Sequence, residues 1–271
     1  MSTTSMYTPS GLEILTGQGV RSEKTHPVLF VHGFSAGAWM FEMNYFGFFR
    51  TQGYQVYALN LRGHGGSTGK EQLAMTSLND FFQDVVEVVG FVTEVAGQRP
   101  ILIGHSMGGV LTQQYIEQHE LPAAVIMSMG EVRAGIQHFM KWCMANYFWL
   151  TLSMMISGKS RKLFGKASVQ RSVLLTPDDK LDDHIIDRFV TQPGSETVFR
   201  DLQKIHLTGN PRTTNVLLVA GDRDPIAPVR AVTSLSERYG CEYQIITNKS
   251  HDLMLSSGWE KAAQTITDWL A

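Results

Sequence analysis

Short apolar runs alternate with longer amphipathic stretches along most of this 271-residue chain. The runs are apolar at every position instead of at alternate positions, which is typical of strands covered on both faces of a parallel sheet. Gly or Pro residues stand beside most of these runs and favour turns there. The pattern predicts six strands, at residues 28–31, 56–59, 101–103, 123–127, 216–220 and 243–246.

Four of the stretches that separate or follow these runs have the periodicity of helices. Between residues 78 and 95, apolar side chains recur at spacings of three and four, which places them on one helix face. Residues 107–117, 229–239 and 259–270 are the other predicted helices. The alternation of strands and helices predicts an α/β fold, with a mostly parallel sheet flanked by helices on both faces.

The alternation stops between residues 130 and 210, where no strand pattern is present. We therefore predict an α/β core formed by residues 1–129 and 211–271, interrupted by a helical cap (lid) at 130–210. Within the cap, residues 138–157 carry one charge, Lys141, and many Met and aromatic residues. A membrane span is disfavoured, because a helix crossing a membrane between two strands would disrupt the sheet. We interpret the stretch as a lid helix over an apolar pocket, with plain core packing as the alternative.

Composition excludes several classes of partner. The chain has 23 Lys and Arg against 25 Asp and Glu, and this balance predicts no nucleic acid partner. Two cysteines, Cys143 and Cys241, make neither a disulfide framework nor a metal-ligand cluster, so we expect no metal and no cofactor. The N-terminal residues lack the charged and apolar regions of a signal peptide, which makes a cytoplasmic location the default expectation.

Residues 104–108 read GHSMG and lie between a predicted strand and a predicted helix. This is the context that the G-x-S-x-G motif requires. The serine stands on a sharp strand-to-helix turn, and the residues two positions away are glycine because a Cβ would collide with the turn. The motif predicts that Ser106 is a nucleophile exposed at the edge of the sheet.

Four further segments resemble the α/β-hydrolase superfamily, and together they cover nearly the whole chain. They read LFVHGF at 29–34, LRGHGGS at 61–67, GDRDPIAP at 221–228 and SHD at 250–252. The resemblance implies a catalytic triad of Ser106, Asp224 and His251, in the order expected of this fold. Asp222 is the alternative to Asp224 as the acid that orients the histidine.

The resemblance also assigns the groups around the nucleophile. The backbone N–H groups of Phe34 and Met107 are expected to form an oxyanion hole, while His32 is expected to hydrogen-bond its own loop. Residues 61–67 are expected to form a structural turn, since they lack the spacing of a phosphate-binding loop. His251 would take the proton of Ser106, and an acyl-enzyme would follow.

The residues of the predicted cap indicate the class of substrate. Flexible methionines and flat aromatic rings accept an acyl chain of varied shape. The runs GHSMGG and RGHG resemble the monoacylglycerol lipase and lysophospholipase-like esterases, which implies a small lipophilic ester such as a monoacylglycerol. The cap is also a candidate for transient contact with a lipid or membrane surface, and nothing in the sequence predicts an oligomeric state. The predicted pocket residues are Trp142, Met144, Phe148, Trp149, Leu152, Met154 and Met155.

Other functions fit the same residues. A thioesterase or a carbon–carbon bond hydrolase would use the same triad, and polar groups in the cap would distinguish them. A catalytically silent binding protein is disfavoured because all three triad residues are present in order. A haloalkane dehalogenase is disfavoured because its chemistry requires a carboxylate where Ser106 stands.

Overall fold

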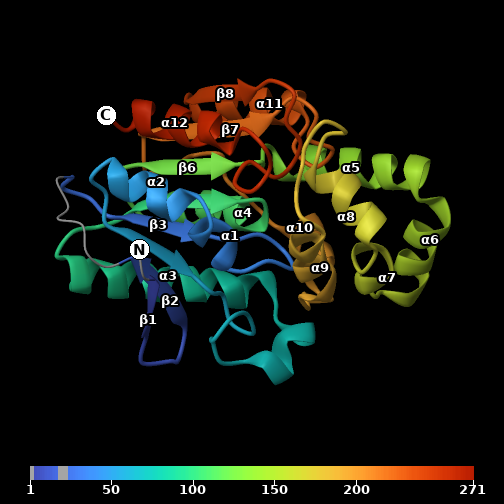
Figure 1. Cartoon of the computed structure of the whole chain (residues 1–271), viewed down its shortest axis with the longest axis horizontal. Helices are drawn as coiled ribbons and strands as arrows, with labels where there is room; N and C mark the ends of the chain where they lie inside the picture. Colours follow the sequence, from blue (N-terminus) through green and yellow to red (C-terminus); the bar gives the residue numbers. More distant parts are fainter. Residues whose placement is uncertain (1–2, 18–23) are drawn as a thin grey trace.

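The centre of the molecule is an eight-stranded sheet with helices on both faces (Figure 1). The structure is a computed structural model that describes residues 3–17 and 24–271. The strand order is β1-β2-β4-β3-β5-β6-β7-β8; β1 and β2 are antiparallel to their neighbours, and the remaining strands are parallel. The strands are β1 (Thr3–Tyr7), β2 (Glu13–Gly17), β3 (Val28–Val31), β4 (Val56–Leu59), β5 (Ile101–His105), β6 (Ala124–Met127), β7 (Val216–Gly221) and β8 (Glu242–Ile246).

All six predicted strands are present, and the two N-terminal strands were not predicted. The predicted strands read as continuous apolar runs because each alternates its side chains between two buried layers. In β3, Leu29 and Val31 pack into one layer, while Val28 and Phe30 pack into the other. β1 contains mostly polar residues and is partly exposed, so it gives no such run.

Helices on the two faces of the sheet match the predicted ones and add short ones. Side chains of α3, α4 and α11 pack in one layer, and those of α1, α2 and α12 in the other. The short α1, α2 and the 3-10 helix η1 were not predicted, because each is at most seven residues long. The bounds are α1 (Trp39–Glu42), α2 (Tyr45–Thr51), η1 (Lys70–Met75), α3 (Leu78–Ala96), α4 (Met107–Ile116), α11 (Val229–Tyr239) and α12 (Trp259–Trp269).

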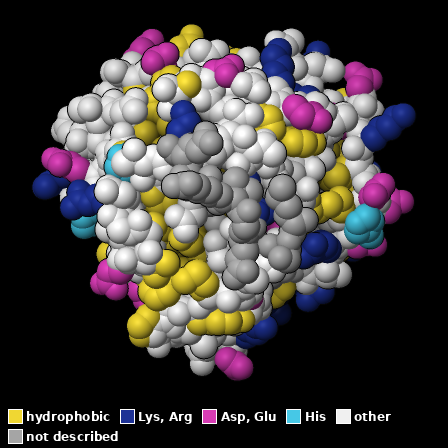
Figure 2. Space-filling model, turned by 60° about the vertical axis from the view of Figure 1, so that its left-hand side comes forward, with side chains coloured by type: hydrophobic (Ala, Val, Ile, Leu, Met, Phe, Trp, Pro, Cys, Tyr) yellow, Lys and Arg dark blue, Asp and Glu magenta, His cyan; other side chains and the backbone are white. Residues whose placement is uncertain are grey.

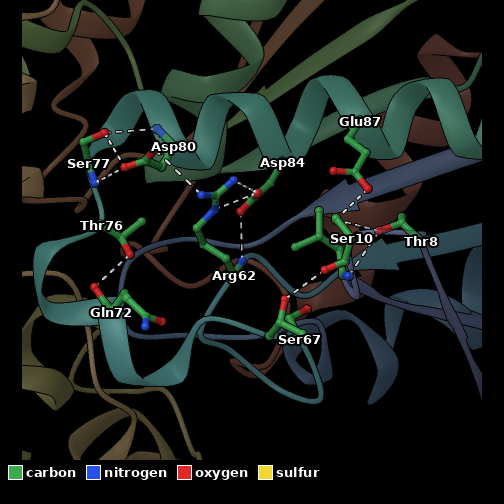
Figure 3. Close-up of polar contacts among 12 residues, drawn as sticks. Thr8, Ser10, Arg62, Ser67, Gln72, Thr76, Ser77, Asp80, Asp84 and Glu87 are labelled. Carbon is green, nitrogen blue, oxygen red and sulfur yellow. Dashed lines mark hydrogen bonds and ion pairs between the residues drawn. The ribbon is translucent and has the colours of Figure 1, made fainter.

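The turn after β4 is fixed by polar contacts to α3 (Figure 3). The Nε and Nη2 atoms of Arg62 donate to Oδ1 of Asp84 at 2.8 and 2.6 Å, and the backbone N–H of Arg62 donates to Oδ2 at 2.9 Å. α3 itself begins in a capping box, in which Ser77 and Asp80 each accept a hydrogen bond from the other's backbone N–H. These contacts give residues 61–67 the structural role that the sequence predicts.

Between β6 and β7, the described residues form six helices and no strand. No described helix is long and apolar enough to cross a membrane. The apolar stretch 138–157 is divided between two helices, because Tyr147 has an extended φ of −140° that ends one helix and precedes the next. The helices are α5 (Val132–Asn146), α6 (Phe148–Ser157), α7 (Arg161–Phe164), α8 (Ala167–Leu174), α9 (Asp183–Thr191) and α10 (Val198–Lys204). We propose that they form the cap, with the division from the core at 130–210.

Candidate active site

Ser106 lies on the turn between β5 and α4 in a strained conformation, with φ of 56° and ψ of −118°. A non-glycine residue rarely adopts a positive φ, so the surrounding structure must hold it there. A Cβ on Gly104 would overlap the carbonyl oxygen of Gly108, and a Cβ on Gly108 would overlap the carbonyl oxygen of Val31. The turn therefore needs glycine at both positions, as the motif predicts.

The structure brings Ser106, His251 and Asp224 into one hydrogen-bonded chain. Nε2 of His251 lies 2.9 Å from Oγ of Ser106, and Nδ1 of His251 lies 2.8 Å from Oδ2 of Asp224. Because a carboxylate only accepts, Nδ1 carries the imidazole proton and Nε2 is left to accept from the serine. Oδ1 of Asp224 accepts from the backbone N–H groups of Ile226 and Ala227 at 2.7 and 3.0 Å.

The side chains of Ser106, His251 and Asp224 are all at least nine-tenths buried. Asp222, the alternative acid, is exposed and accepts instead from the backbone N–H of Lys249 at 3.2 Å. The geometry therefore pairs Asp224, and not Asp222, with His251.

Two buried side chains hold the backbone of His251. Its carbonyl oxygen accepts from Oγ of Ser128 at 2.8 Å and from Nε2 of His105 at 2.9 Å. Burial, with the neighbouring His251, lowers the pKa of His105 to about 3, so His105 is neutral with its proton on Nε2. Sequence reasoning missed Ser128, whose only signal is that it directly follows a strand at the carboxyl edge of the sheet.

The loop after β3 lies directly against the nucleophile. A Cβ on Gly33 would come within 2.9 Å of Cβ of Ser106, so the loop approaches as closely as a backbone can. Met107 is the first residue of α4, and the N–H groups of a first helical turn have no acceptor within the helix. Phe34 and Met107 both line the cavity beside Ser106. Their role as the oxyanion hole stays a prediction that this placement supports.

His32 supports that loop, as the sequence predicts. Its Nδ1 donates to the carbonyl oxygen of Gly33 at 2.8 Å, and its Nε2 accepts from the backbone N–H of Leu61 at 3.1 Å. Burial lowers the pKa of His32 well below its ordinary value, which keeps the ring neutral. The ring thus ties the loop after β3 to the turn that Arg62 holds against α3.

A cavity of about 80 Å³ opens beside Ser106 and His251. Apart from these two residues and His105, its walls are almost wholly apolar. Phe164 and Phe199 stack with ring centroids 5.2 Å apart, and the ring of Phe34 lies edge-on to both. The part of the wall that comes from the helices between β6 and β7, with the segments joining them, consists of Ile136, Phe139, Phe164, Gln170, Val173, Leu174, Phe189, Val198, Phe199 and Leu202.

The structure places none of the seven predicted pocket residues in this wall. Trp149 and Met155 are 77% and 59% exposed, and Phe148 is 46% exposed. Met154 is buried within the helical cap, away from the cavity, and the remaining three, Trp142, Met144 and Leu152, are half-buried. The correction has a physical reason: Ile136 and Phe139 of α5 line the cavity, whereas α6 lies at the outer end of the molecule (Figure 1) and leaves Trp149 and Met155 exposed. The spacing of Val132, Ile136, Phe139 and Cys143 along α5 was the available signal.

The described residues hold no group of three or more His, Cys, Asp or Glu side chains that could bind a metal ion. Both cysteines are free, and burial raises the pKa of Cys143 to about 12 and that of Cys241 to about 11. Neither thiol is therefore a nucleophile at neutral pH.

Relatives of this chain include esterases and lipases. Methyl jasmonate esterase 1 of Vitis vinifera is 33% identical over 112 residues, which cover 40% of this chain and 41% of that esterase. A monoacylglycerol lipase of Mycolicibacterium smegmatis is 36% identical over 91 residues, 32% of this chain and 31% of that lipase. The chain thus aligns with less than half of the length of each relative.

Solved structures match over nearly the whole chain. The epoxide hydrolase VrEH1 from Vigna radiata has a TM-score of 0.71 at 14% identity, over 99% of this chain and 97% of that one. A monoacylglycerol lipase of Paleococcus ferrophilus has a TM-score of 0.64 at 19% identity, over 96% of this chain and 98% of that one. At these identities the likeness shows the fold, and it confirms the predicted α/β-hydrolase architecture.

A family model describes most of the chain. Residues 22–257 match Hydrolase_4, the serine aminopeptidase S33 family. The match contains the strand-to-helix turn of Ser106 as well as Asp224 and His251. The protein therefore belongs to this family of α/β-hydrolases.

Proposed function

We propose that the protein is a serine carboxylic ester hydrolase that acts on a lipophilic acyl ester such as a monoacylglycerol. The observation that carries the proposal is the hydrogen-bonded chain of Ser106, His251 and Asp224 beside an apolar cavity. An apolar wall next to a nucleophile favours a substrate whose acyl group is a hydrocarbon.

The geometry suits an acyl-enzyme mechanism. Nε2 of His251 takes the proton from Ser106 as its oxygen attacks the carbonyl carbon, and Asp224 stabilises the resulting imidazolium. The backbone N–H groups of Phe34 and Met107 would donate to the oxyanion; the loss of one such donor typically costs about 10²–10³ in rate. His251 then gives its proton to the leaving alcohol, and a water that it deprotonates releases the acid. No cofactor enters any of these steps.

Chemistry distinguishes this proposal from two activities that relatives' names suggest. A serine that opens an epoxide would form an ether with the substrate. An ether has no carbonyl carbon that water could attack, so the product would stay bound to the enzyme. Ser106 therefore fits esters and not epoxides. An aminopeptidase must bind the ammonium group of its substrate. The residues lining the cavity include no Asp or Glu, and an unpaired ammonium there would be costly.

One polar side chain favours a hydroxylated alcohol group. Gln170 is the only polar residue that the helices between β6 and β7 contribute to the cavity wall. Its Nε2 donates to the carbonyl oxygen of Phe164 at 2.8 Å, and no described residue donates to its Oε1. A glycerol hydroxyl would supply a donor to this acceptor, whereas a simple alkyl ester would leave it unpaired.

The first test is hydrolysis of p-nitrophenyl esters from acetate to palmitate. We expect an optimum at medium or long chains, and activity that disappears in Ser106→Ala but remains in the surface control Ser157→Ala. Labelling by a fluorophosphonate probe should follow the same pattern, since only an activated serine reacts at a useful rate. A folded wild-type protein that neither hydrolyses esters nor labels would indicate the catalytically silent alternative.

A second comparison addresses the substrate class. We expect a monoacylglycerol to be hydrolysed faster than the methyl ester of the same acid, and Gln170→Leu to reduce this preference by about tenfold. Faster hydrolysis of the matching acyl thioester would support the thioesterase alternative instead. Selective cleavage of a β-diketone would support carbon–carbon bond hydrolysis. The cytoplasmic location inferred from the N-terminus stays a prediction.

A further inference from the structure

The outer face of α6 leaves large apolar side chains in water. Trp149 and Ile156 are 77% and 79% exposed, and Met155 is 59% exposed. α6 carries no charged residue. It lies at the end of the molecule farthest from the sheet (Figure 1). Exposed apolar patches of this kind mark sites that contact a partner or a membrane.

The surrounding sequence carries charge of one sign. From Val132 to Pro177 there are seven Lys and Arg residues and no Asp or Glu, although the whole chain has a net charge of −2. Four exposed cations, Lys159, Arg161, Lys162 and Lys166, follow α6 directly and form no ion pair with any described residue. On the face shown in Figure 2, by contrast, acidic and basic side chains are interspersed.

We infer that these two features form one surface, which binds the interface of a membrane containing anionic phospholipids. We call it the α6–α7 surface: Phe148, Trp149, Met155, Ile156, Lys159, Arg161, Lys162 and Lys166. Tryptophan and other large apolar side chains enter the boundary between headgroups and acyl chains. Lys and Arg beside them are attracted to anionic headgroups. Among the hydrogen bonds of the described residues, Glu196, which accepts from the backbone N–H of Ser160, is the one acidic side chain placed beside these four cations. The excess of positive charge next to an uncharged apolar helix suits an anionic lipid surface.

The inner side of α6 connects this surface to the cavity. Met154 and Leu150 pack into the same apolar cluster as Phe139 and Phe164, and those two rings line the cavity beside Ser106. A lipid surface in contact with α6 would therefore lie one layer of side chains away from the cavity wall. The inference goes beyond the proposed function and does not depend on it, since binding to lipid requires no chemistry at Ser106.

Vesicle sedimentation tests the inference on the full chain. The vesicles are phosphatidylcholine alone, and phosphatidylcholine mixed with phosphatidylserine. We expect the wild type to bind the mixed vesicles more tightly, and salt to weaken that binding. Each cation near an anionic surface contributes roughly fivefold in partitioning, so Lys159→Gln/Lys162→Gln should bind roughly 25-fold more weakly. Trp149→Ser/Ile156→Ser should bind more weakly to both kinds of vesicle, whereas the control Arg99→Gln/Lys261→Gln, which removes two cations elsewhere, should match the wild type.

Three results would overturn the inference. The wild type could stay in solution with both kinds of vesicle, or Lys159→Gln/Lys162→Gln could bind as tightly as the wild type. In the third, the wild type does not bind vesicles but forms a dimer in sedimentation analysis, and the substitutions Trp149→Ser/Ile156→Ser dissociate that dimer. This result would assign the surface to a second copy of the chain. Hydrolysis of soluble p-nitrophenyl butyrate should be equal in all variants, which shows that they fold. Its absence in the wild type would refute the proposed function and leave the vesicle result standing.

Discussion

Replacing Asp224 with Asn tests whether this carboxylate sets the position of the proton on His251. Oδ1 of Asp224 accepts from two backbone N–H groups at 2.7 and 3.0 Å, and Oδ2 faces Nδ1 of His251 at 2.8 Å. Since the two backbone groups can only donate, an Asn must turn its carbonyl oxygen to them and its amide nitrogen to the imidazole. That nitrogen donates to Nδ1, which moves the imidazole proton to Nε2. The ring then points an N–H at Ser106 and cannot take its proton.

The magnitude follows from the alternatives open to the Asn side chain. The opposite orientation would leave two backbone N–H groups facing another donor, at a cost of about 1–3 kcal/mol each. The orientation with the wrong imidazole tautomer is therefore favoured. In a triad, the wrong tautomer lowers kcat by about 10⁴, or roughly 5.5 kcal/mol in the activation free energy. KM should change little, because Asp224 does not line the cavity.

The assay is the steady-state hydrolysis of a p-nitrophenyl ester, with the folded state of each variant checked by circular dichroism. The matched control is Asp222→Asn, since Asp222 is exposed and lies two positions earlier on the same loop. We expect the control to retain activity within about a factor of two. The reasoning is refuted if Asp224→Asn loses less than about tenfold in kcat, or if Asp222→Asn loses as much as Asp224→Asn.

Three further predictions concern stability, substrate length and folding. Burial raises the pKa of Asp252 to about 6. Between about pH 4 and 6, the folded state therefore holds a proton that the unfolded state has released. The free energy of unfolding falls as the pH rises through this window. Asp252→Asn should therefore be about 1–3 kcal/mol more stable than the wild type at neutral pH and lose this advantage near pH 4 in urea unfolding; an advantage independent of pH would contradict the explanation. Phe199→Ala, which removes a ring from the cavity wall, should shift the optimum of the p-nitrophenyl series to longer chains, whereas Trp149→Ala on the exposed face should not; equal shifts would show that the cavity is wrongly assigned. Gly108→Ala should prevent folding because its Cβ would overlap a carbonyl oxygen of β3, while Gly47→Ala, with nothing within 4 Å of the added Cβ, should give a normal circular dichroism spectrum.

The sheet and the nucleophile could be predicted because local constraints determine both. Each central strand is covered on two faces, and this requires the continuous apolar runs that the sequence displays. The turn at Ser106 leaves no room for a Cβ at Gly104 or Gly108. Both positions must therefore be glycine, and this requirement makes the motif recognisable in the sequence. The acid and base are found by their positions after β7 and β8, at the carboxyl edge that also presents the serine.

The N-terminal hairpin could not be predicted because polar contacts hold it. β1 pairs only with β2 and is partly exposed, so its residues need no continuous apolar pattern. Glu13 in β2 is buried, and its carboxylate accepts from Ser5, from Asn60 and from the backbone N–H of Gly66. These partners come from β1 and from the loop after β4, two segments about 55 residues apart in sequence. No local pattern in the sequence reveals that they meet.

The residues of the cavity wall could not be predicted for a related reason. The stacked rings of Phe164 and Phe199 come from two short helices that are far apart in sequence, and only the folded cap brings them together. Hydrophobicity alone pointed to the most apolar segment, whose helix α6 faces outward. A chain gains nothing in folding free energy from apolar side chains left in water, so stability of the cap does not account for the exposed Trp149 and Ile156. Contact with a lipid surface does account for them, because the same side chains would then be buried in their functional state.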